Sequence, residues 1–465
     1  MNVDTQLDAL FKPKSIAVVG ASRKPGKIGY EILRNLIEYG YKGKIYPINP
    51  QAKEILGLKC YKSVKEVPDE IDMAVISIPA QIILDAVKDC GEKGVKALVV
   101  ITSGFSEVGN VELEEKLVEM ARSYGMRILG PNIFGIVYTP HNMNATFGPK
   151  DVIKGGIAFI TQSGALGIAL MGWTILEEIG LSAVVSMGNM ADIDAIEVAE
   201  YLADDPNTKV ITIYLEGLKP GKGREFIESM KKVTMKKPVI IVKSGRSERG
   251  AAAAASHTGS LAGSDLIYDV AMKQCGVLRA LNIEEMFDWA RALATQPLAK
   301  GNNTVIITNG GGAGVMATDA AADYGVELLD PPQDLKEEFR KHMPWFGSAK
   351  NPVDLTGMAT PDKYYEAVRA AFKHPAVHTI TVLYCRTAVC DPMELAKLLI
   401  EARKEAIDKG INKPISVAMI GGVDVYEAMK HLNRNGIPAY PIPERAVSAI
   451  AAIIKYSMYV KRGKQ

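Results

Sequence analysis

Residues 15–40 decide the fold, and they read SIAVVGASRKPGKIGYEILRNLIEYG. The first five residues are small or β-branched and apolar, which is typical of a buried strand. A turn rich in glycine and serine follows, and after it apolar residues recur at helical spacing. Strand, glycine-rich turn and helix in this order form the unit from which helix-covered parallel sheets are built. The apolar positions of the predicted helix are Ile28, Ile32, Leu33, Leu36 and Ile37.

The same unit recurs twice more along the chain. Residues 156–180 read GIAFITQSGALGIALMGWTILEEIG, and residues 304–325 read TVIITNGGGAGVMATDAAADYG. Residues 160–167 align directly with residues 307–314. We therefore predict an α/β protein of three domains in series, each with a mainly parallel sheet. The expected domains are 1–148, 149–297 and 298–465.

Length and charge agree with this organisation. At about 150 residues per domain, 465 residues give about three domains. Lys and Arg number 55 against 53 Asp and Glu, a net charge of +2. This balance excludes the strongly basic surface of a nucleic-acid-binding protein.

Cysteine usage and hydropathy indicate the compartment. The 5 cysteines are odd in number, scattered and never spaced as CxxC, which argues against a disulfide framework and a zinc site. No apolar run approaches the roughly 18 residues that span a bilayer, and the start has no signal-peptide pattern. We expect a cytoplasmic protein with no metal site and no membrane association.

Glycine is in excess, and its placement points to ligands. Of 465 residues 42 are glycine, about 9% against an average of about 7%, and they gather after the apolar runs. The first turn combines backbone N–H groups with a helix amino end, which is a natural phosphate site. A tight turn without a ligand is the alternative interpretation. The small residues of this turn are Gly20, Ala21, Ser22, Gly26 and Gly29.

The residues around this turn favour one class of nucleotide. The NAD fingerprint needs an acidic residue at the end of the second strand, but Ile48, Asn49 and Pro50 stand there, with Lys53 beyond them. Basic residues near the turn suit a nucleotide with an extra ribose phosphate, such as coenzyme A or NADP. These basic residues are Arg23, Lys24, Lys27 and Lys53.

Two further segments are candidates for chemistry on phosphate. Ser163, Gly164 and Ala165 open a predicted helix and could hold a small oxyanion, although an ordinary N-cap at Ser163 explains the pattern equally well. His257 lies among alanines and glycines, without bulky neighbours, where a neutral imidazole could act as a nucleophile; a solvated loop histidine beside a helix cap is the alternative. Glu216 follows a predicted buried strand and could accept the Nδ1–H of a histidine, although by itself the pattern favours a strand-end carboxylate in water.

Taken together, these motifs resemble a known family, the NDP-forming acyl-CoA synthetases, which include succinyl-CoA synthetase and the ADP-forming acetyl-CoA synthetases. The resemblance runs nearly end to end. In the family's order the matching strings are Gly20-Ala-Ser22, Asn49-Pro50 with Lys53, Ile78-Pro79-Ala80, Ile101-Thr-Ser103-Gly104, Gly130-Pro131-Asn132, Gln162-Ser163-Gly164, Leu215-Glu216-Gly217, Ser256-His257-Thr258-Gly259, Asn351-Pro352-Val353-Asp354 and Pro441-Ile-Pro443-Glu444-Arg445-Ala446-Val447.

The resemblance implies a fold and a site. The fold is a Rossmann-like CoA-binding domain followed by two flavodoxin-like ligase domains. It implies that His257 is phosphorylated during turnover and that Glu216 holds it, while phosphate and the phosphohistidine lie against the helix that Ser163 opens. The implied phosphate-binding residues are Ser163, Gly164, Ala165 and Gly259. The implied CoA-binding residues are Gly20, Ala21, Ser22, Gly26, Gly29, Asn49, Lys53, Ile78, Pro79, Ser103 and Asn132.

The resemblance also implies a reaction and a partner. Acyl-CoA, here acetyl-CoA, phosphate and ADP would be converted reversibly to free acid, CoA and ATP, which is substrate-level phosphorylation. The three domains leave no room for the family's ATP-grasp domain. We therefore expect an alpha-type subunit of an α2β2 assembly whose partner binds ADP or ATP with magnesium. The family's succinyl-CoA synthetases have cysteine where Ile133 stands, so no thiol role carries over.

Two rival functions follow from the same features. A CoA-binding regulatory protein could keep the fold and lose the chemistry, although His257 and Glu216 would then not be expected together. An NADP-linked oxidoreductase could use the first turn. Preference for CoA over NADPH separates that rival from a synthetase subunit.

Overall fold

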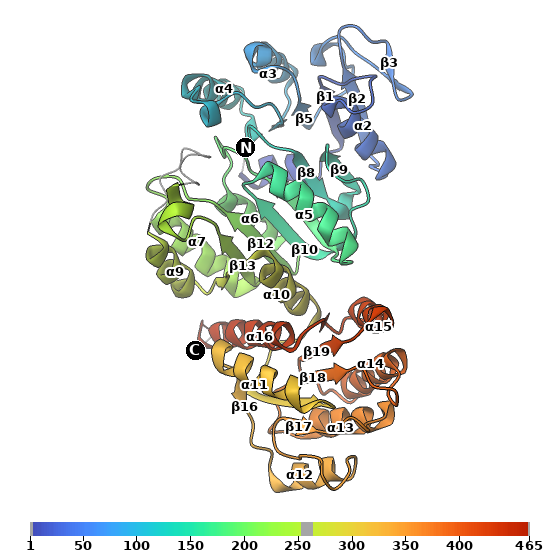
Figure 1. The fold of residues 1–465 in the computed structure, drawn as a ribbon. Helices are drawn as coiled ribbons and strands as arrows, with labels where there is room; N and C mark the ends of the chain where they lie inside the picture. Colours follow the sequence, from blue (N-terminus) through green and yellow to red (C-terminus); the bar gives the residue numbers. More distant parts are fainter. Residues whose placement is uncertain (1–2, 253–263, 464–465) are drawn as a thin grey trace. The chain divides into compact units, whose positions relative to one another are not determined.

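The computed structural model describes residues 3–252 and 264–463, which fall into two compact units that divide after Arg279 (Figure 1). Unit 1 contains two large sheets, and unit 2 contains one. The strands of the three glycine-rich units recognised in the sequence, β1, β10 and β15, thus belong to three different sheets. The predicted α/β class is confirmed.

The first sheet of unit 1 has 5 strands, all parallel, in the order β2-β1-β5-β6-β7. The chain moves outward from β1 to β2 and then returns to β5, so the winding direction changes beside β1. The strands are β1 (Ser15–Val19), β2 (Lys44–Ile48), β5 (Met73–Ile76), β6 (Ala97–Val100) and β7 (Arg127–Leu129), with a short hairpin of β3 (Glu54–Ile55) and β4 (Leu58–Lys59). The helices are α1 (Val3–Phe11), α2 (Ile28–Glu38), α3 (Ile83–Lys93) and α4 (Val111–Ser123).

Both faces of this sheet are buried, which explains why its strands are apolar throughout. Ile16 and Val18 of β1 belong to the core that contains the buried face of α2. Ala17 and Val19 point the other way, into the core that contains the buried residues of α3 and α4. The alternating side chains of this one strand therefore pack into two separate cores.

The second sheet of unit 1 has 7 strands in the order β14-β13-β12-β10-β11-β8-β9. Neighbours from β13 to β11 are parallel, and β8 and β9 form an antiparallel hairpin at one edge. The strands are β8 (Gly135–Tyr138), β9 (Met143–Thr146), β10 (Lys154–Thr161), β11 (Leu181–Ser186), β12 (Val210–Leu215), β13 (Val239–Lys243) and β14 (Leu278–Ala280). The helices are α5 (Gly164–Leu176), α6 (Ala195–Asp204), α7 (Gly223–Lys236) and α9 (Asp265–Gln274).

The hairpin of β8 and β9 joins this second sheet although it precedes the domain boundary expected after residue 148. That boundary, like the one expected after residue 297, stays a prediction. What the structure adds is that β8 pairs with β11 and β9 pairs with β8, so that residues 135–146 belong to the second sheet.

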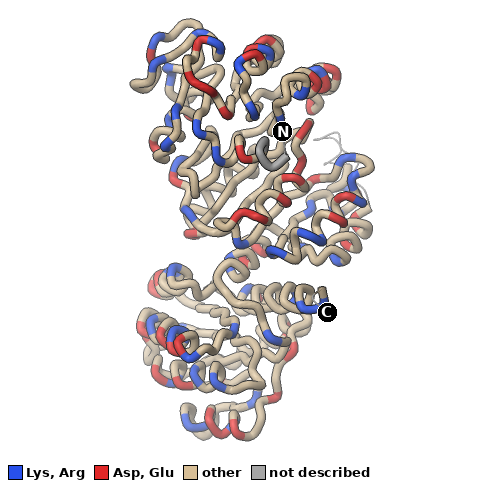
Figure 2. The backbone as a smooth tube through the Cα atoms, turned by 180° about the vertical axis from the view of Figure 1, so that it is seen from behind, with Lys and Arg blue, Asp and Glu red and all other residues tan. Residues whose placement is uncertain are grey.

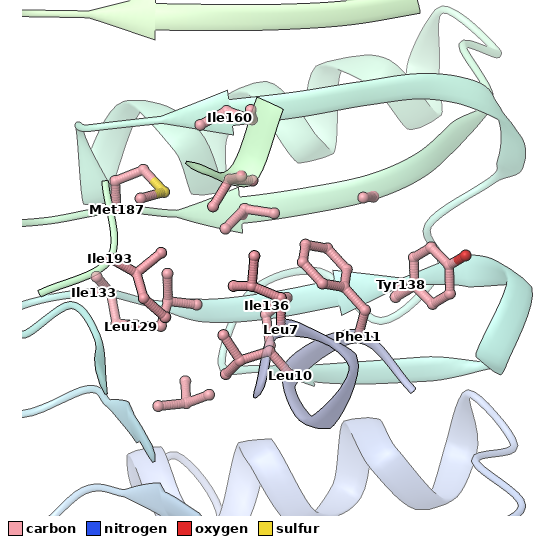
Figure 3. Packing of buried hydrophobic residues seen from close by; sticks show 14 of the residues in the cluster. Leu7, Leu10, Phe11, Leu129, Ile133, Ile136, Tyr138, Ile160, Met187 and Ile193 are labelled. Atoms are coloured by element: carbon pink, nitrogen blue, oxygen red, sulfur yellow. The ribbon is translucent and has the colours of Figure 1, made fainter. Parts of the chain in front are cut away.

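One hydrophobic core joins the two sheets of unit 1 (Figure 3). Phe11 of α1 lies edge-on to Tyr138 of β8, with ring centroids 5.6 Å apart. Leu129 and Ile133, at the end of the first sheet, pack in the same cluster as Ile193, which follows the second sheet's β11. The two sheets therefore form one body.

Unit 2 is built on a 6-stranded sheet with the main order β16-β15-β18-β19-β20 and with β17 paired to β15. The strands are β15 (Asn303–Thr308), β16 (Glu327–Leu328), β17 (Val353–Asp354), β18 (Thr379–Cys385), β19 (Ile415–Ile420) and β20 (Ala439–Tyr440). The helices are α10 (Ile283–Thr295), α11 (Gly311–Tyr324), α12 (Gln333–Arg340), α13 (Pro361–Lys373), α14 (Pro392–Asp408), α15 (Val423–Arg434) and α16 (Pro443–Gly463).

Charged residues of both signs are interspersed along the described backbone (Figure 2). This distribution agrees with the net charge of +2. Within residues 3–252 and 264–463, no helix combines the length and the apolar character that crossing a membrane requires.

A buried ion pair fastens α10 to α16 in unit 2. Arg445 donates two hydrogen bonds to Asp288, at 2.6 and 2.7 Å, and its third nitrogen lies 2.6 Å from Glu284. The side chain of Asp288 is only 6% exposed. A carboxylate at this depth depends on its partner, because an unpaired buried charge costs several kcal/mol.

We predict that Arg445→Met destabilises unit 2 by about 3–5 kcal/mol, since it leaves Asp288 buried without a cation. Urea unfolding followed by circular dichroism measures the loss. The double variant Asp288→Leu, Arg445→Met should recover most of it, because both charges are then gone. An Arg445→Met protein as stable as the wild type would contradict the role assigned to the pair.

Candidate functional site

The residues predicted to bind the nucleotide follow the carboxyl ends of the five strands in the first sheet. Gly20 follows β1 and Asn49 follows β2, while Ile78 and Pro79 come just after β5. Ser103 comes shortly after β6, and Asn132 shortly after β7. Because all the strands are parallel, their carboxyl ends meet at one edge of the sheet, where α/β proteins bind ligands. The structure thus brings these residues to a common edge.

Two glycines of the first turn are required by close packing. Gly20 has φ +92°, and a Cβ on it would lie 2.7 Å from the carbonyl oxygen of Ser77. A Cβ on Gly29 would lie 2.1 Å from the carbonyl oxygen of Gly20. The turn and the first turn of α2 therefore approach each other as backbones, which requires glycine at both positions.

Side-chain amides and hydroxyls fix the loops at this edge. Asn49 Nδ2 donates to the carbonyl oxygen of Ala21 at 2.7 Å, which ties the loop after β2 to the turn after β1. Thr102 Oγ1 donates to the carbonyl oxygen of Ile78 at 2.7 Å. Lys53 and Ser103 are solvent-exposed beside these loops. The edge is therefore a fixed backbone frame with exposed polar and basic side chains, which fits a phosphate-bearing nucleotide.

The second turn lies at the carboxyl edge of the second sheet. Ser163 caps α5, and its Oγ accepts a hydrogen bond from the N–H of Leu166 at 3.4 Å. Thr161 Oγ1 accepts from the N–H of Ser163 at 3.2 Å and donates to the carbonyl oxygen of Ser163 at 3.0 Å. Ala165 is exposed, and among the described residues no atom outside the adjoining helix turn lies within 4 Å of the position that a Cβ on Gly164 would take. Ser163 is thus an N-cap of α5.

Glu216 stands at the same edge, directly after β12, and is 7% exposed. Burial raises the pKa of Tyr214, which lies two residues earlier. The charge of Glu216 and a hydrogen bond with Glu216 also act to raise the pKa of Tyr214. Lys243, the last residue of β13, is 2% exposed, and its Nζ lies 4.8 Å from the ring centroid of Tyr268. Burial lowers the pKa of Lys243. Glu216 thus lies among partly buried ionisable groups.

The predicted nucleophile lies outside the described residues. His257 and Gly259 fall in residues 253–263, between β13 and α9. The hydrogen bond expected between His257 and Glu216 therefore stays a prediction. The described flanks do bring the chain back to the carboxyl edge of the second sheet, because β13 ends there.

Gln162 belongs to the motif Gln162-Ser163-Gly164, and the sequence alone predicts no role for its side chain. Its side-chain Oε1 accepts hydrogen bonds from the N–H groups of Glu216 and Gly217, the latter at 3.1 Å. Its Nε2 donates to the carbonyl oxygen of Gly217 at 3.2 Å. The turn that carries Ser163 is thereby fastened to the residue that carries the candidate carboxylate.

A second polar cluster links the two sheets of unit 1. Asn189 Nδ2 donates to Glu107 at 2.6 Å and to Glu114 at 2.8 Å. Glu107 in turn accepts the N–H groups of Gly104 and Phe105, directly after Ser103. Burial acts to raise the pKa of Glu107, but the hydrogen bonds from Asn189 and the backbone outweigh it and lower the pKa. The candidate nucleotide loop is thus hydrogen-bonded to the loop that follows β11.

Comparison with known proteins agrees with this arrangement. A family model for a CoA-binding domain matches residues 14–139, a model for the flavodoxin-like domain of succinyl-CoA ligase matches residues 154–293, and a ligase-CoA domain model matches residues 304–462. The chain belongs to the NDP-forming acyl-CoA synthetases, a family of ligases.

Within that family the chain is similar to alpha subunits of ADP-forming acetate–CoA ligases. It is 59% identical to the alpha subunit of acetate–CoA ligase (ADP-forming) I of Pyrococcus furiosus, over 99% of both chains. It is 44% identical to the ADP-forming acetate–CoA ligase of Methanocaldococcus jannaschii, covering 98% of this chain and 64% of that protein. The structure of acetyl-coenzyme A synthetase 1 from Ca. Korarchaeum cryptofilum, a complex with phosphate and ADP, matches with a TM-score of 0.96 and 55% identity, over 99% of both chains.

We predict that two glycines of unit 1 differ in how well they tolerate substitution by alanine. Gly29→Ala should lower stability by roughly 1–3 kcal/mol, because its Cβ meets backbone that cannot yield easily. Gly164→Ala should change stability by less than about 1 kcal/mol, because among the described residues its Cβ meets nothing outside its own helix. Thermal unfolding of the two variants beside the wild type tests the pair, and equal losses would show that the close approach at Gly29 is not required.

Proposed function

We propose that this chain is the alpha subunit of an ADP-forming acyl-CoA synthetase that acts on acetyl-CoA. Acetyl-CoA, phosphate and ADP are converted reversibly to acetate, CoA and ATP. Near-full-length identity of 59% to an alpha subunit of acetate–CoA ligase supports both the reaction and the acyl group. The CoA-binding family model over residues 14–139 supports the thioester substrate.

The observation that carries the proposal is the meeting of two elements at one sheet edge. The amino end of α5 follows β10, and the buried Glu216 follows the neighbouring strand β12. A helix amino end stabilises an oxyanion, and a carboxylate can orient a histidine. Phosphate chemistry on a histidine needs both groups within one site.

The reaction proceeds in two steps on this chain. A phosphate oxygen, held by Ser163, Gly164 and Ala165, attacks the thioester carbonyl carbon, so that a C–O bond forms, the C–S bond breaks and CoA thiolate leaves. A ring nitrogen of His257 then attacks phosphorus, so that a P–N bond forms and acetate leaves with the bridging oxygen. Glu216 accepts the N–H of the other ring nitrogen and stabilises the positive charge that develops on the ring.

The phosphoryl group then passes to ADP on a second subunit. The P. furiosus relatives are called alpha subunits, and the M. jannaschii relative of similar name is a longer protein, of which this chain covers only 64%. We propose that a separate ATP-grasp beta subunit supplies the remaining part and binds ADP with magnesium. A cytoplasmic α2β2 heterotetramer is the proposed assembly.

Labelling tests the nucleophile directly. Wild-type chain incubated with acetyl-CoA and ³²P-phosphate should acquire an acid-labile, base-stable label, as expected for phosphohistidine, whereas His257→Ala should acquire none. Label that persists in His257→Ala would show that the nucleophile is wrongly assigned.

Binding measurements separate the rival functions. Calorimetry should show binding of CoA and none of NADPH, and the reverse would favour an oxidoreductase. A chain that binds CoA but forms no phosphohistidine, alone or with its beta subunit, would instead be the catalytically inactive CoA-binding regulator.

A further inference from the structure

The side chain of Gln162 is committed to the protein's own backbone. Its oxygen accepts two N–H groups, and its nitrogen donates to one carbonyl oxygen and contacts Met190 Sδ at 3.7 Å. An amide oxygen has two lone-pair sites, and both are occupied here. Gln162 is therefore arranged to hold a part of the protein and not a ligand.

The part that Gln162 holds carries the candidate carboxylate. The two N–H groups belong to Glu216 and Gly217, and the carbonyl oxygen belongs to Gly217. The Gln162 N–H also donates to the carbonyl oxygen of Tyr214 at 3.2 Å. Main chain and side chain of one residue thus fix the path of the chain from residue 214 to residue 217.

Unit 2 repeats this arrangement at the aligned position. Asn309 Oδ1 accepts the N–H of Cys385 at 2.8 Å, and its Nδ2 donates to the carbonyl oxygen of Cys385 at 2.9 Å. Thr308 makes the same turn with Gly310 that Thr161 makes with Ser163. The last residue of β10 pairs with a residue of β12, and the last residue of β15 pairs with a residue of β18. Glu216 and Cys385 each lie two residues after that partner, so Cys385 occupies in unit 2 the place of Glu216.

The comparison separates two roles of the amide. In both units the amide hydrogen-bonds backbone groups at the end of the neighbouring strand, since a shorter Asn does so in unit 2. In unit 1 the longer Gln reaches two successive N–H groups, and it holds an ionisable residue next to the helix that Ser163 caps.

We propose that Gln162 is a positioning residue of the phosphoryl-transfer site, which sets the carboxylate of Glu216 relative to the amino end of α5. The inference rests on the proposed function. Loss of the amide would let the Glu216 backbone shift while the strands stay in place. A shift of about 1 Å in a group that orients a nucleophile can cost about 100-fold in rate.

The test measures phosphohistidine formation in the full complex with the beta subunit. Gln162→Met keeps the side-chain length and removes the hydrogen bonds. It should lower the single-turnover rate of labelling about 10- to 100-fold and leave the KM for acetyl-CoA within about 2-fold. In a Glu216→Ala background, where no carboxylate remains to be placed, the same substitution should lower the rate by less than about 3-fold.

The equivalent residue in unit 2 provides a control for the loss of stability. Asn309→Leu removes the equivalent hydrogen bonds in unit 2, and its change in melting temperature calibrates the loss that strand-end closure alone produces. Should Gln162→Met fail to fold, Gln162→Glu keeps the acceptor, removes the donor to Gly217 and enters the same measurements.

The outcomes discriminate between the inference and the function it rests on. Wild-type labelling rates in Gln162→Met, or equal rate losses with and without Glu216, overturn the positioning role. If the wild-type complex itself forms no phosphohistidine, the proposed function fails, and the role of Gln162 falls with it.

Discussion

The backbone groups at the carboxyl ends of buried parallel strands must be paired where the sheet ladder stops, and side-chain amides do this in all three sheets. Asn49 joins two strand ends in the first sheet, Gln162 does so in the second and Asn309 in unit 2. An unpaired buried N–H or carbonyl group would cost about 1–3 kcal/mol. Each amide therefore pairs backbone groups at a strand end that the sheet ladder leaves unpaired.

This constraint explains where chemistry is placed. The candidate residues of unit 1 lie on loops whose first residues are fixed by the sheets, so their positions follow from strand order. The edge with the candidate nucleotide-binding residues and the edge with Ser163 and Glu216 belong to different sheets. Asn189 and the shared core of unit 1 nevertheless keep the two sheets in one body.

Much of this organisation was predictable because it is local. Strand, turn and helix follow from periodicity, and Ile32, Leu33 and Leu36 are buried as expected. Ile28 and Ile37, read as part of the same apolar face, are 43% and 39% exposed because they lie at its margins. The hairpin at 135–146, the packing of α10 on α16 and the contacts of Gln162 were not predictable, because each depends on partners far away in the sequence. The distance from Gln162 to Glu216 is 54 residues.

On the proposed function, this chain performs one half of a reaction whose other half needs an ATP-grasp subunit. ATP formation from acetyl-CoA, phosphate and ADP, measured with each subunit alone and with the two mixed, tests it most directly. We expect ATP only in the mixture, in an amount equal to the CoA released. ATP formed by this chain alone, or CoA released by the mixture without ATP, would contradict it.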